Sequence, residues 1–394
     1  MNANAVGEAA PFDTAKLDRL MDAGGIDIIV ANSKHNVQYM LGGYRFSAFD
    51  FTDAIALSRY LPLVVYQKGQ PDKVAYFGCP MEPYEREIGR IWAPEVDFTS
   101  QGTVDAMQSA CRYIESLGGA PRSIGVEKSF LPADALEVLT GSFEGTRLSD
   151  VRYVLERLRS VKSARELAIL KSASERVEEA MVQAFAEARP GMSRVELLRR
   201  LEWSEVQRDL DFQYCYSSMG QQRNPSQHLE QILRAEDTVT LDSGGNYKGY
   251  IGDITRMGAF GTPDQQLVDL LAEVEEVQKA ARDVVRAGVR GGDVIDAGRA
   301  VKARLPHGSL MEYVAHGMGM VAHEAPQLAD ENPHEYPGAD KDHALEAGMV
   351  ISIESGFFHP ERGLVRLEDT VAVTPDGHEI YGKVARGWNP MGVA

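Results

Sequence analysis

The sequence predicts two domains, an α/β domain at residues 1–160 and an α+β domain at residues 161–394. A chain of 394 residues is longer than one ordinary hydrophobic core requires. Over about the first 150 residues, short β-rich runs alternate with amphipathic helical runs, which is typical of an α/β domain. Downstream, a pair of helices separated by a glycine break occurs twice, each time before β-rich segments.

In the N-terminal domain, the spacing of apolar residues predicts helices and strands in alternation. The expected helices cover residues 12–21, 104–117 and 132–139, and the expected strands cover 26–31, 61–66, 73–77 and 123–126. Residues 36–43 are rich in turn residues and are expected to form a loop.

The second domain opens with two capping-box signatures, at Ser163 and at Ser193, each followed by a glutamate three residues later. These signatures predict the starts of two helices. About a hundred residues later, Thr262 precedes a similar pair of helices, again with a glycine break between them. The repetition fits ordinary helix hairpins, and it also fits a duplicated α+β domain with a pseudo-twofold axis.

Composition and charge exclude several classes of partner. The formal net charge is −17, which argues against nucleic acid or an anionic membrane as a partner. Residues 1–11 lack the features of a signal peptide, and no apolar run is long enough to span a bilayer. The cysteines Cys79, Cys111 and Cys215 are widely spaced and form no CxxC pair, so we expect neither disulfides nor a thiolate zinc site. A cytoplasmic location fits best.

Two aspartates in the second domain are candidates for shared chemistry. The β-rich run 238–241 predicts a strand that ends on Asp242, and Gly244-Gly245 predicts a tight turn. The returning strand carries Asp253, eleven positions after Asp242. Two carboxylates held together raise each other's pKa unless a cation or a shared proton lies between them. Taken alone, the pair also fits two surface acids that flank a turn.

Three further clusters follow. His316 and His323 flank a Gly-x-Gly loop, where small residues allow a ligand to approach the backbone. Glu354 ends a β-branched strand, and alternation places Arg366 and Glu368 on one face of the next strand. Each of these residues, taken alone, also fits an ordinary surface or core position.

Combined, the clusters predict a metal site. The set contains four carboxylates and one imidazole: Asp242, Asp253, His316, Glu354 and Glu368. Such a hard, oxygen-rich set suits Mn, Co, Fe or Zn. Five ligands exceed what one tetrahedral ion needs, so we expect two divalent ions with bridging carboxylates.

The order and spacing of these residues resemble the pita-bread metallopeptidase family, M24, which includes methionine aminopeptidase, aminopeptidase P and prolidase. The resemblance covers residues 163–381, and the preceding domain resembles the creatinase-type N-terminal domain of the proline-specific branch. The blocks that carry it are Leu241–Gly244, Gly252–Arg256, His316–Pro326, Gly348–Gly356 and Val365–Asp369. The resemblance implies a pita-bread catalytic domain with pseudo-twofold symmetry.

The resemblance also implies how the metal site works. Asp242 would bind one ion, and His316 and Glu354 would bind the other. Asp253 and Glu368 would bridge the two ions. A hydroxide between the ions would attack the scissile carbonyl of an Xaa-Pro peptide. As a ligand of one of these ions, His316 would count among the catalytic residues.

Other residues are assigned by the resemblance to catalysis and substrate binding. Glu354 would also transfer the proton, and His323 would contact the substrate or stabilise the oxyanion. Arg366 would orient Glu368 or the substrate. A homodimer is implied, with the N-terminal domain of one subunit near the cleft of the other. Tyr44 and Arg45 could then reach a substrate, although they also fit an ordinary surface loop.

One position departs from the family pattern. Peptidases of this family usually carry a histidine seventeen residues before the first metal aspartate, where this chain has Pro225. His228 lies three residues later and could replace it as a substrate-binding residue. The departure keeps a second interpretation open, a small-molecule C–N hydrolase similar to ectoine hydrolase or a lyase similar to dimethylsulfoniopropionate lyase. A third interpretation is a non-enzymatic binding protein, although the chain has lost none of the five ligands.

Overall fold

The computed structural model describes residues 9–221, 230–328 and 339–394. The chain divides into two compact units, Met1–Leu158 and Arg159–Ala394, which are described separately. In the described part of the chain, no helix combines the length and the apolar character that crossing a membrane requires.

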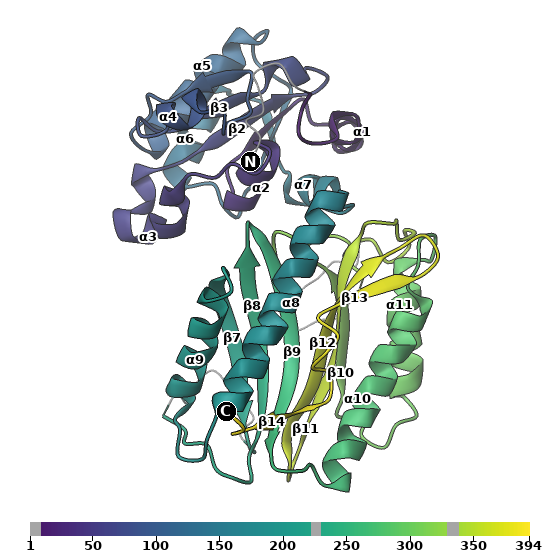
Figure 1. Ribbon diagram of the computed structural model, residues 1–394. Coiled ribbons are helices and arrows are strands. Elements are labelled where there is room, and N and C mark those ends of the chain that lie inside the picture. The colour runs from purple at the N-terminus through teal and green to yellow at the C-terminus, as the bar shows by residue number, and fades with distance from the viewer. Residues whose placement is uncertain (1–8, 222–229, 329–338) are drawn as a thin grey trace. The chain divides into compact units, whose positions relative to one another are not determined.

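The first unit is built around a sheet with helices packed beside it (Figure 1). The sheet is mixed and six-stranded, in the order β4-β3-β2-β1-β5-β6. Its strands are β1 (Ile28–Ala31), β2 (Leu63–Gln67), β3 (Ala75–Phe77), β4 (Glu95–Asp97), β5 (Ser123–Val126) and β6 (Arg147–Asp150). Its α-helices are α1 (Thr14–Gly24), α2 (Lys34–Met40), α3 (Thr52–Ile55), α4 (Pro83–Glu87), α5 (Thr103–Ser116), α6 (Ala133–Ser142) and α7 (Arg152–Arg159). Short 3₁₀ helices lie at Ser47–Phe51, Leu57–Arg59 and Pro71–Lys73.

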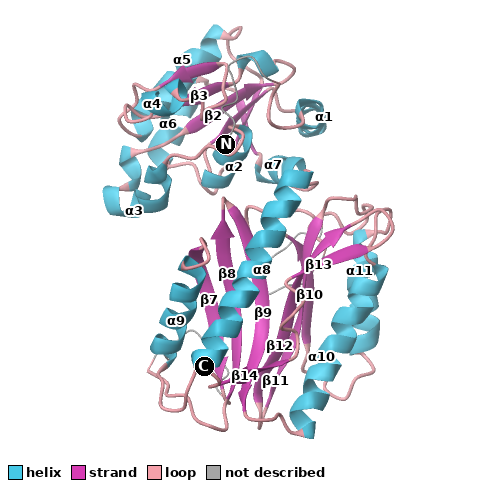
Figure 2. Cartoon of the chain, viewed as in Figure 1, coloured by secondary structure: helices cyan, strands magenta, loops and turns pink. Residues whose placement is uncertain are grey.

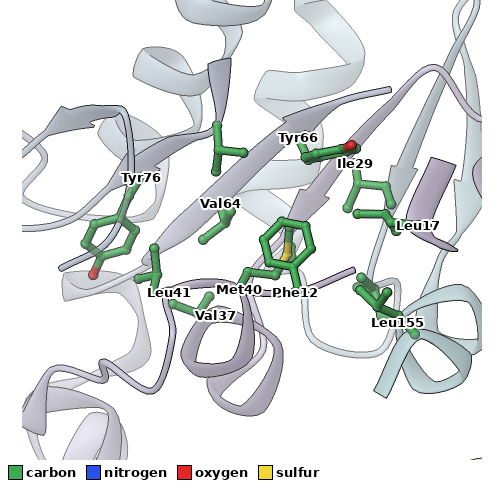
Figure 3. Close-up of a cluster of buried hydrophobic side chains, with 14 of the residues drawn as sticks. Phe12, Leu17, Ile29, Val37, Met40, Leu41, Val64, Tyr66, Tyr76 and Leu155 are labelled. Carbon is green, nitrogen blue, oxygen red and sulfur yellow. The ribbon is translucent and has the colours of Figure 1, made fainter. Parts of the chain in front are cut away.

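Both faces of this sheet are buried, so the central strand β1 is apolar throughout. Ile29 belongs to a core cluster on one face, and Ile28 belongs to a second cluster on the other. Figure 3 shows part of the first cluster, in which Phe12, Met40 and Tyr66 lie together. The expected α/β architecture is confirmed.

One local prediction in this unit was wrong. Residues 36–43 were expected to form a loop, but the helix α2 runs to Met40. The Ser33 hydroxyl accepts a hydrogen bond from the Asn36 N–H and so caps this helix. Val37 and Met40 then face the core, and the turn residues Gly42 and Gly43 follow the helix end.

The second unit contains an eight-stranded sheet in the order β10-β11-β12-β9-β8-β7, with β13 paired to β12 and β14 to β9. Its strands are β7 (Asp211–Met219), β8 (Thr238–Tyr247), β9 (Tyr250–Phe260), β10 (Glu312–Gly317), β11 (Val350–His359), β12 (Gly363–Val373), β13 (His378–Tyr381) and β14 (Trp388–Met391). Its helices are α8 (Ala164–Glu187), α9 (Arg194–Val206), α10 (Gln265–Val284) and α11 (Gly291–Lys302). Both predicted capping boxes are present, at Ser163 and Ser193.

The same arrangement of helices and strands occurs twice in this unit. Two helices and three antiparallel strands form a first half, α8-α9-β7-β8-β9, and a second half, α10-α11-β10-β11-β12. The halves meet where β9 lies antiparallel to β12, which is the relation that a local twofold axis produces. The helices cover the sheet as a separate layer (Figure 2). The prediction of a duplicated α+β domain with a pseudo-twofold axis is therefore confirmed.

The turn after Asp242 is not where the sequence placed it. Strand β8 continues through both glycines to Tyr247, and the chain turns at Lys248 and Gly249, both with positive φ. Gly244 serves close approach instead, because a Cβ there would lie 2.4 Å from the Tyr214 ring. Asp242 therefore lies inside the strand and not at its end.

Candidate metal centre

The strands of the first half place two carboxylates on one face of the sheet. Asp242 lies opposite Thr255, and Asp253 lies two residues from Thr255 along β9, so both aspartates share a face. The neighbouring Gly252 points the other way, because a Cβ there would lie 2.5 Å from the backbone of Ala173 in α8. The aspartates thus lie on the face away from the helices.

The second half adds its three residues to the same face. Glu354 lies directly opposite Glu368, and His316 lies opposite Ser352, two residues from Glu354. Glu368 in turn lies opposite Thr255 of the first half. Residues that face each other across antiparallel strands share a side of the sheet.

All five candidate ligands therefore meet at one place. The ligand atoms of Asp242, Asp253 and Glu368 lie within 4.8 Å of one another, and so do those of His316, Glu354 and Glu368. Glu368 belongs to both groups. Two overlapping groups of carboxylates and an imidazole have the oxygen-rich composition that suits divalent ions.

Within the described part of the chain, two buried polar atoms of these residues have no hydrogen-bond partner, Nε2 of His316 and Oδ1 of Asp253. Nδ1 of His316 lies 3.2 Å from the Gly317 carbonyl oxygen, which can only accept a hydrogen bond. Nδ1 therefore carries the hydrogen and leaves a lone pair on Nε2. Burial lowers the pKa of His316 to about 4, so the ring is neutral near pH 7. These atoms fit a cation.

The raised pKa values of Asp242 and Asp253 also fit a bound cation. Burial, followed by the charge of Glu368, raises the pKa of Asp242 to about 7. Burial also raises the pKa of Asp253 well above its usual range, with Glu368 and Asp242 contributing. A bound divalent cation offsets both causes, because it favours the ionised carboxylates.

The shared ligand is held from both sides by hydroxyl groups. Thr255 Oγ1 donates to one oxygen of Glu368 at 3.0 Å, and Ser352 Oγ donates to the other at 2.7 Å. Arg366, by contrast, pairs with Glu354 and lies 4.0 Å from Asp242. Arg366 thus pairs with two other candidate ligands, Glu354 and Asp242.

The model of the metallopeptidase family M24 matches residues 168–375, which is more than half of the chain. The chain belongs to metallopeptidase family M24. The model of the creatinase/prolidase N-terminal domain matches residues 14–161. The family resemblance indicated by the sequence motifs is confirmed, and the protein is an enzyme of the metallopeptidase class.

Relatives of this M24 enzyme match it over nearly its whole length. The Xaa-Pro dipeptidase of Pyrococcus horikoshii is 24% identical over 94% of this chain and 97% of its own. The Xaa-Pro dipeptidase of Lactobacillus delbrueckii is 25% identical over 93% and 95%. Among solved structures, the Xaa-Pro dipeptidase from Bacillus anthracis has a TM-score of 0.80 at 24% identity and covers 96% of this chain and 99% of its own. That structure supports the fold.

In this M24 enzyme, the exposed His323 lies directly against the candidate metal centre. Its ring stacks on His316, with 3.8 Å between the centroids and 21° between the planes. The next residue, Glu324, is buried and forms ion pairs with Arg159 at 2.8 Å and with Lys162 at 3.2 Å. These pairs fix the chain beside His323, which itself faces solvent.

Sequence reasoning missed Tyr214, which lies on β7. Its hydroxyl is hydrogen-bonded to the Asp253 carboxylate, and its ring occupies the space that Gly244 leaves free. Burial, followed by the charge of Asp253, raises the pKa of Tyr214 well above its usual range. The only signal in the sequence was a glycine inside a strand, which indicates that another group approaches closely.

The other predicted substrate residues belong to the first unit or fall outside the described residues. Pro225 and His228 belong to the part of the chain that is not described. In the first unit, Tyr44 is buried and its hydroxyl donates to Glu82 at 2.9 Å, so it forms part of that unit's core. Arg45 pairs with Asp50 at 3.1 Å. A contact of either residue with a substrate stays a prediction.

Proposed function

We propose that this enzyme is a dinuclear metallohydrolase that cleaves Xaa-Pro peptides. The observation that carries the proposal is the pair of overlapping ligand groups that share Glu368. The relatives named Xaa-Pro dipeptidase support the substrate class.

The five residues would divide between two divalent ions of Mn, Co, Fe or Zn. Asp242 would hold one ion, His316 and Glu354 would hold the other, and Asp253 and Glu368 would serve both. When bound, the ions would polarise the scissile carbonyl and lower the pKa of the attacking water.

The surrounding side chains do the remaining work. Glu354, which is partly exposed, accepts the proton of the attacking water and passes it to the leaving nitrogen. His323 reaches the substrate from its stacked position on His316 and stabilises the developing negative charge. Arg366, beside Glu354 and Asp242, binds the polar end of a short peptide.

Proline release from dipeptides tests this proposal. The purified protein is loaded with Mn²⁺ and offered Ala-Pro and Gly-Pro, with Ala-Gly as the matched peptide that lacks proline. We expect proline release from the first two, and its loss in Asp253→Ala and His316→Ala. No proline release from any Xaa-Pro peptide at full metal loading would contradict the proposal.

The sequence departure at Pro225 favours a second candidate on the same metal site, a small-molecule C–N hydrolase or a lyase. The two candidates share the metal ligands and differ in the substrate. Turnover of a cyclic amidine or a sulfonium substrate by the Mn²⁺-loaded protein, without proline release, would favour the second candidate.

We further propose a homodimer in the cytoplasm. The free thiols Cys79, Cys111 and Cys215 support a reducing compartment. Sedimentation at several protein concentrations tests the dimer.

A further inference from the structure

The two halves of the catalytic unit are joined by very little backbone pairing. Within a half, β8 pairs with β9 and β11 pairs with β12 along ladders of ten residues each. Between the halves, β9 and β12 share one paired position, Thr255 opposite Glu368. The Ile251 N–H also donates to the Gly319 carbonyl oxygen across this boundary at 2.8 Å, so side chains supply much, but not all, of the link between the halves.

This boundary divides the candidate ligands unequally. His316, Glu354 and Glu368 all belong to the second half, so one ligand group lies within that half. The other group takes Asp242 and Asp253 from the first half and Glu368 from the second. Only the group of Asp242, Asp253 and Glu368 changes its geometry when the halves move relative to each other.

On the opposite face of the sheet, Arg256 joins the halves directly. This fully buried side chain extends from β9. Its Nη1 donates to the carbonyl oxygens of Thr255 at 2.9 Å and of Glu368 at 2.7 Å, the two residues of the single paired position. Its Nη2 lies 3.0 Å from the Asp369 carboxylate on β12.

Asp369 is also fully buried, and three guanidinium groups surround it. Besides Arg256, Nη1 of Arg282 and Nε of Arg386 each lie 3.0 Å from the carboxylate. Arg282 and Arg386 also both pair with Glu275 on α10.

A third acid, Glu178 on α8, completes the network. It pairs with Arg256 at 2.9 Å and accepts hydrogen bonds at 3.0 Å from the N–H groups of Val384 and Ala385. The arginines and acids of the network thus balance in charge, and they link a helix from each half to the segment that follows β13.

We propose that Arg256 and Asp369, together with Arg282 and Arg386, are positioning residues that hold the two halves of the metal site at their working distance. The proposal rests on the proposed metal site. Buried ion pairs are weak sources of stability, because the cost of desolvation offsets their attraction. The rigid guanidinium fork, in contrast, fixes geometry well, and here one fork binds backbone oxygens of both halves.

Metal titration tests the proposal, because the network acts on one ligand group and not on the other. The variant is Arg386→Gln, at the partly exposed edge of the network, with Arg256→Lys as the stronger change. Each change is combined with one of two ligand substitutions. His316→Ala keeps the ligand group that spans the boundary between the halves. Asp242→Ala keeps the ligand group that lies within the second half. Mn²⁺ affinity is measured by calorimetry.

We expect Arg386→Gln to weaken Mn²⁺ binding about tenfold in the His316→Ala background and to leave it unchanged in the Asp242→Ala background. Leu201→Ala, a buried position in α9, is the control for lost stability alone. It is expected to lower the melting temperature without separating the two backgrounds. Equal weakening in both backgrounds, or none in either, would overturn the proposal.

The two proposals fail differently. If the wild-type protein binds no Mn²⁺, the proposed metal site itself is wrong. If it binds two ions and Arg386→Gln does not separate the backgrounds, only the positioning role is wrong. Where Arg256→Lys does not fold, as its melting curve would show, Arg386→Gln decides the question.

Discussion

The Thr255 hydroxyl on β9 donates a hydrogen bond of 3.0 Å to the Glu368 carboxylate on β12, across the boundary between the two halves of the catalytic unit. Ser352 donates to the other oxygen of the same carboxylate at 2.7 Å. Each half of the sheet therefore orients the one ligand that both metal groups share. Ligands whose orientation is fixed by such hydrogen bonds bind metal more tightly.

Thr255→Val should weaken Mn²⁺ binding by about tenfold, because the shape of the side chain is kept while the hydrogen bond to Glu368 is lost. Calorimetric titration measures the change. Thr238→Val is the matched control, since Thr238 donates to the Arg362 carbonyl oxygen and contacts none of the five ligands. Equal affinities for wild type and Thr255→Val would show that the hydroxyl does not orient the carboxylate.

Gly244→Ala should also reduce metal affinity. The added Cβ would lie 2.4 Å from the Tyr214 ring and would push it away from Asp253. Gly245→Ala makes the same chemical change on the opposite face, where the Cβ would lie 2.8 Å from Val177. That variant should lose stability in urea unfolding yet bind Mn²⁺ like wild type once folded. If both variants bind metal equally, Tyr214 has no part in the site.

The Glu324 carboxylate offers a test of stability beside the metal centre. Glu324→Gln leaves the buried Arg159 and Lys162 without their anionic partner, so the free energy of unfolding should fall by about 3–5 kcal/mol. Adding Lys162→Met should recover part of this loss, because one unpaired charge disappears. The exposed pair of Lys279 and Asp283 is the control, and Asp283→Asn should change stability little. Strict additivity of the two changes would argue against the ion pairs.

The buried carboxyl group of Glu205 should make the free energy of unfolding depend on pH. Burial raises the pKa of this carboxyl from 4.5 to about 7. The folded state therefore binds the proton more tightly than the unfolded state does, and stability falls as pH rises from about 4.5 to about 7. The loss is at most about 3 kcal/mol.

Urea unfolding of the metal-free protein at several pH values checks this dependence. Glu205→Gln keeps the hydrogen bond with the Ser243 hydroxyl and removes the ionisable group. This variant should be less sensitive to pH than wild type over the same range, and more stable at pH 8. Parallel pH profiles of the two proteins would refute the raised pKa.

The order and spacing of the five ligands sufficed to predict the family, because metal ligands must recur at fixed strand positions, whereas the two-domain fold followed from chain length and the alternation of strands and helices. The turn was misplaced because Gly244-Gly245 looks the same whether it turns the chain or admits a neighbouring ring. Only the packing of Tyr214 separates the two cases. The network around Asp369 joins residues far apart in sequence, and no local pattern connects Arg256 with Arg386.

Proline release from Ala-Pro, measured while Mn²⁺ is added to the metal-free protein, tests whether this enzyme is a dinuclear Xaa-Pro hydrolase. We expect no release without metal, a rise with added Mn²⁺, and saturation at about two ions per chain, in keeping with two overlapping ligand groups. Two bound ions without proline release from any Xaa-Pro peptide would contradict the proposed reaction.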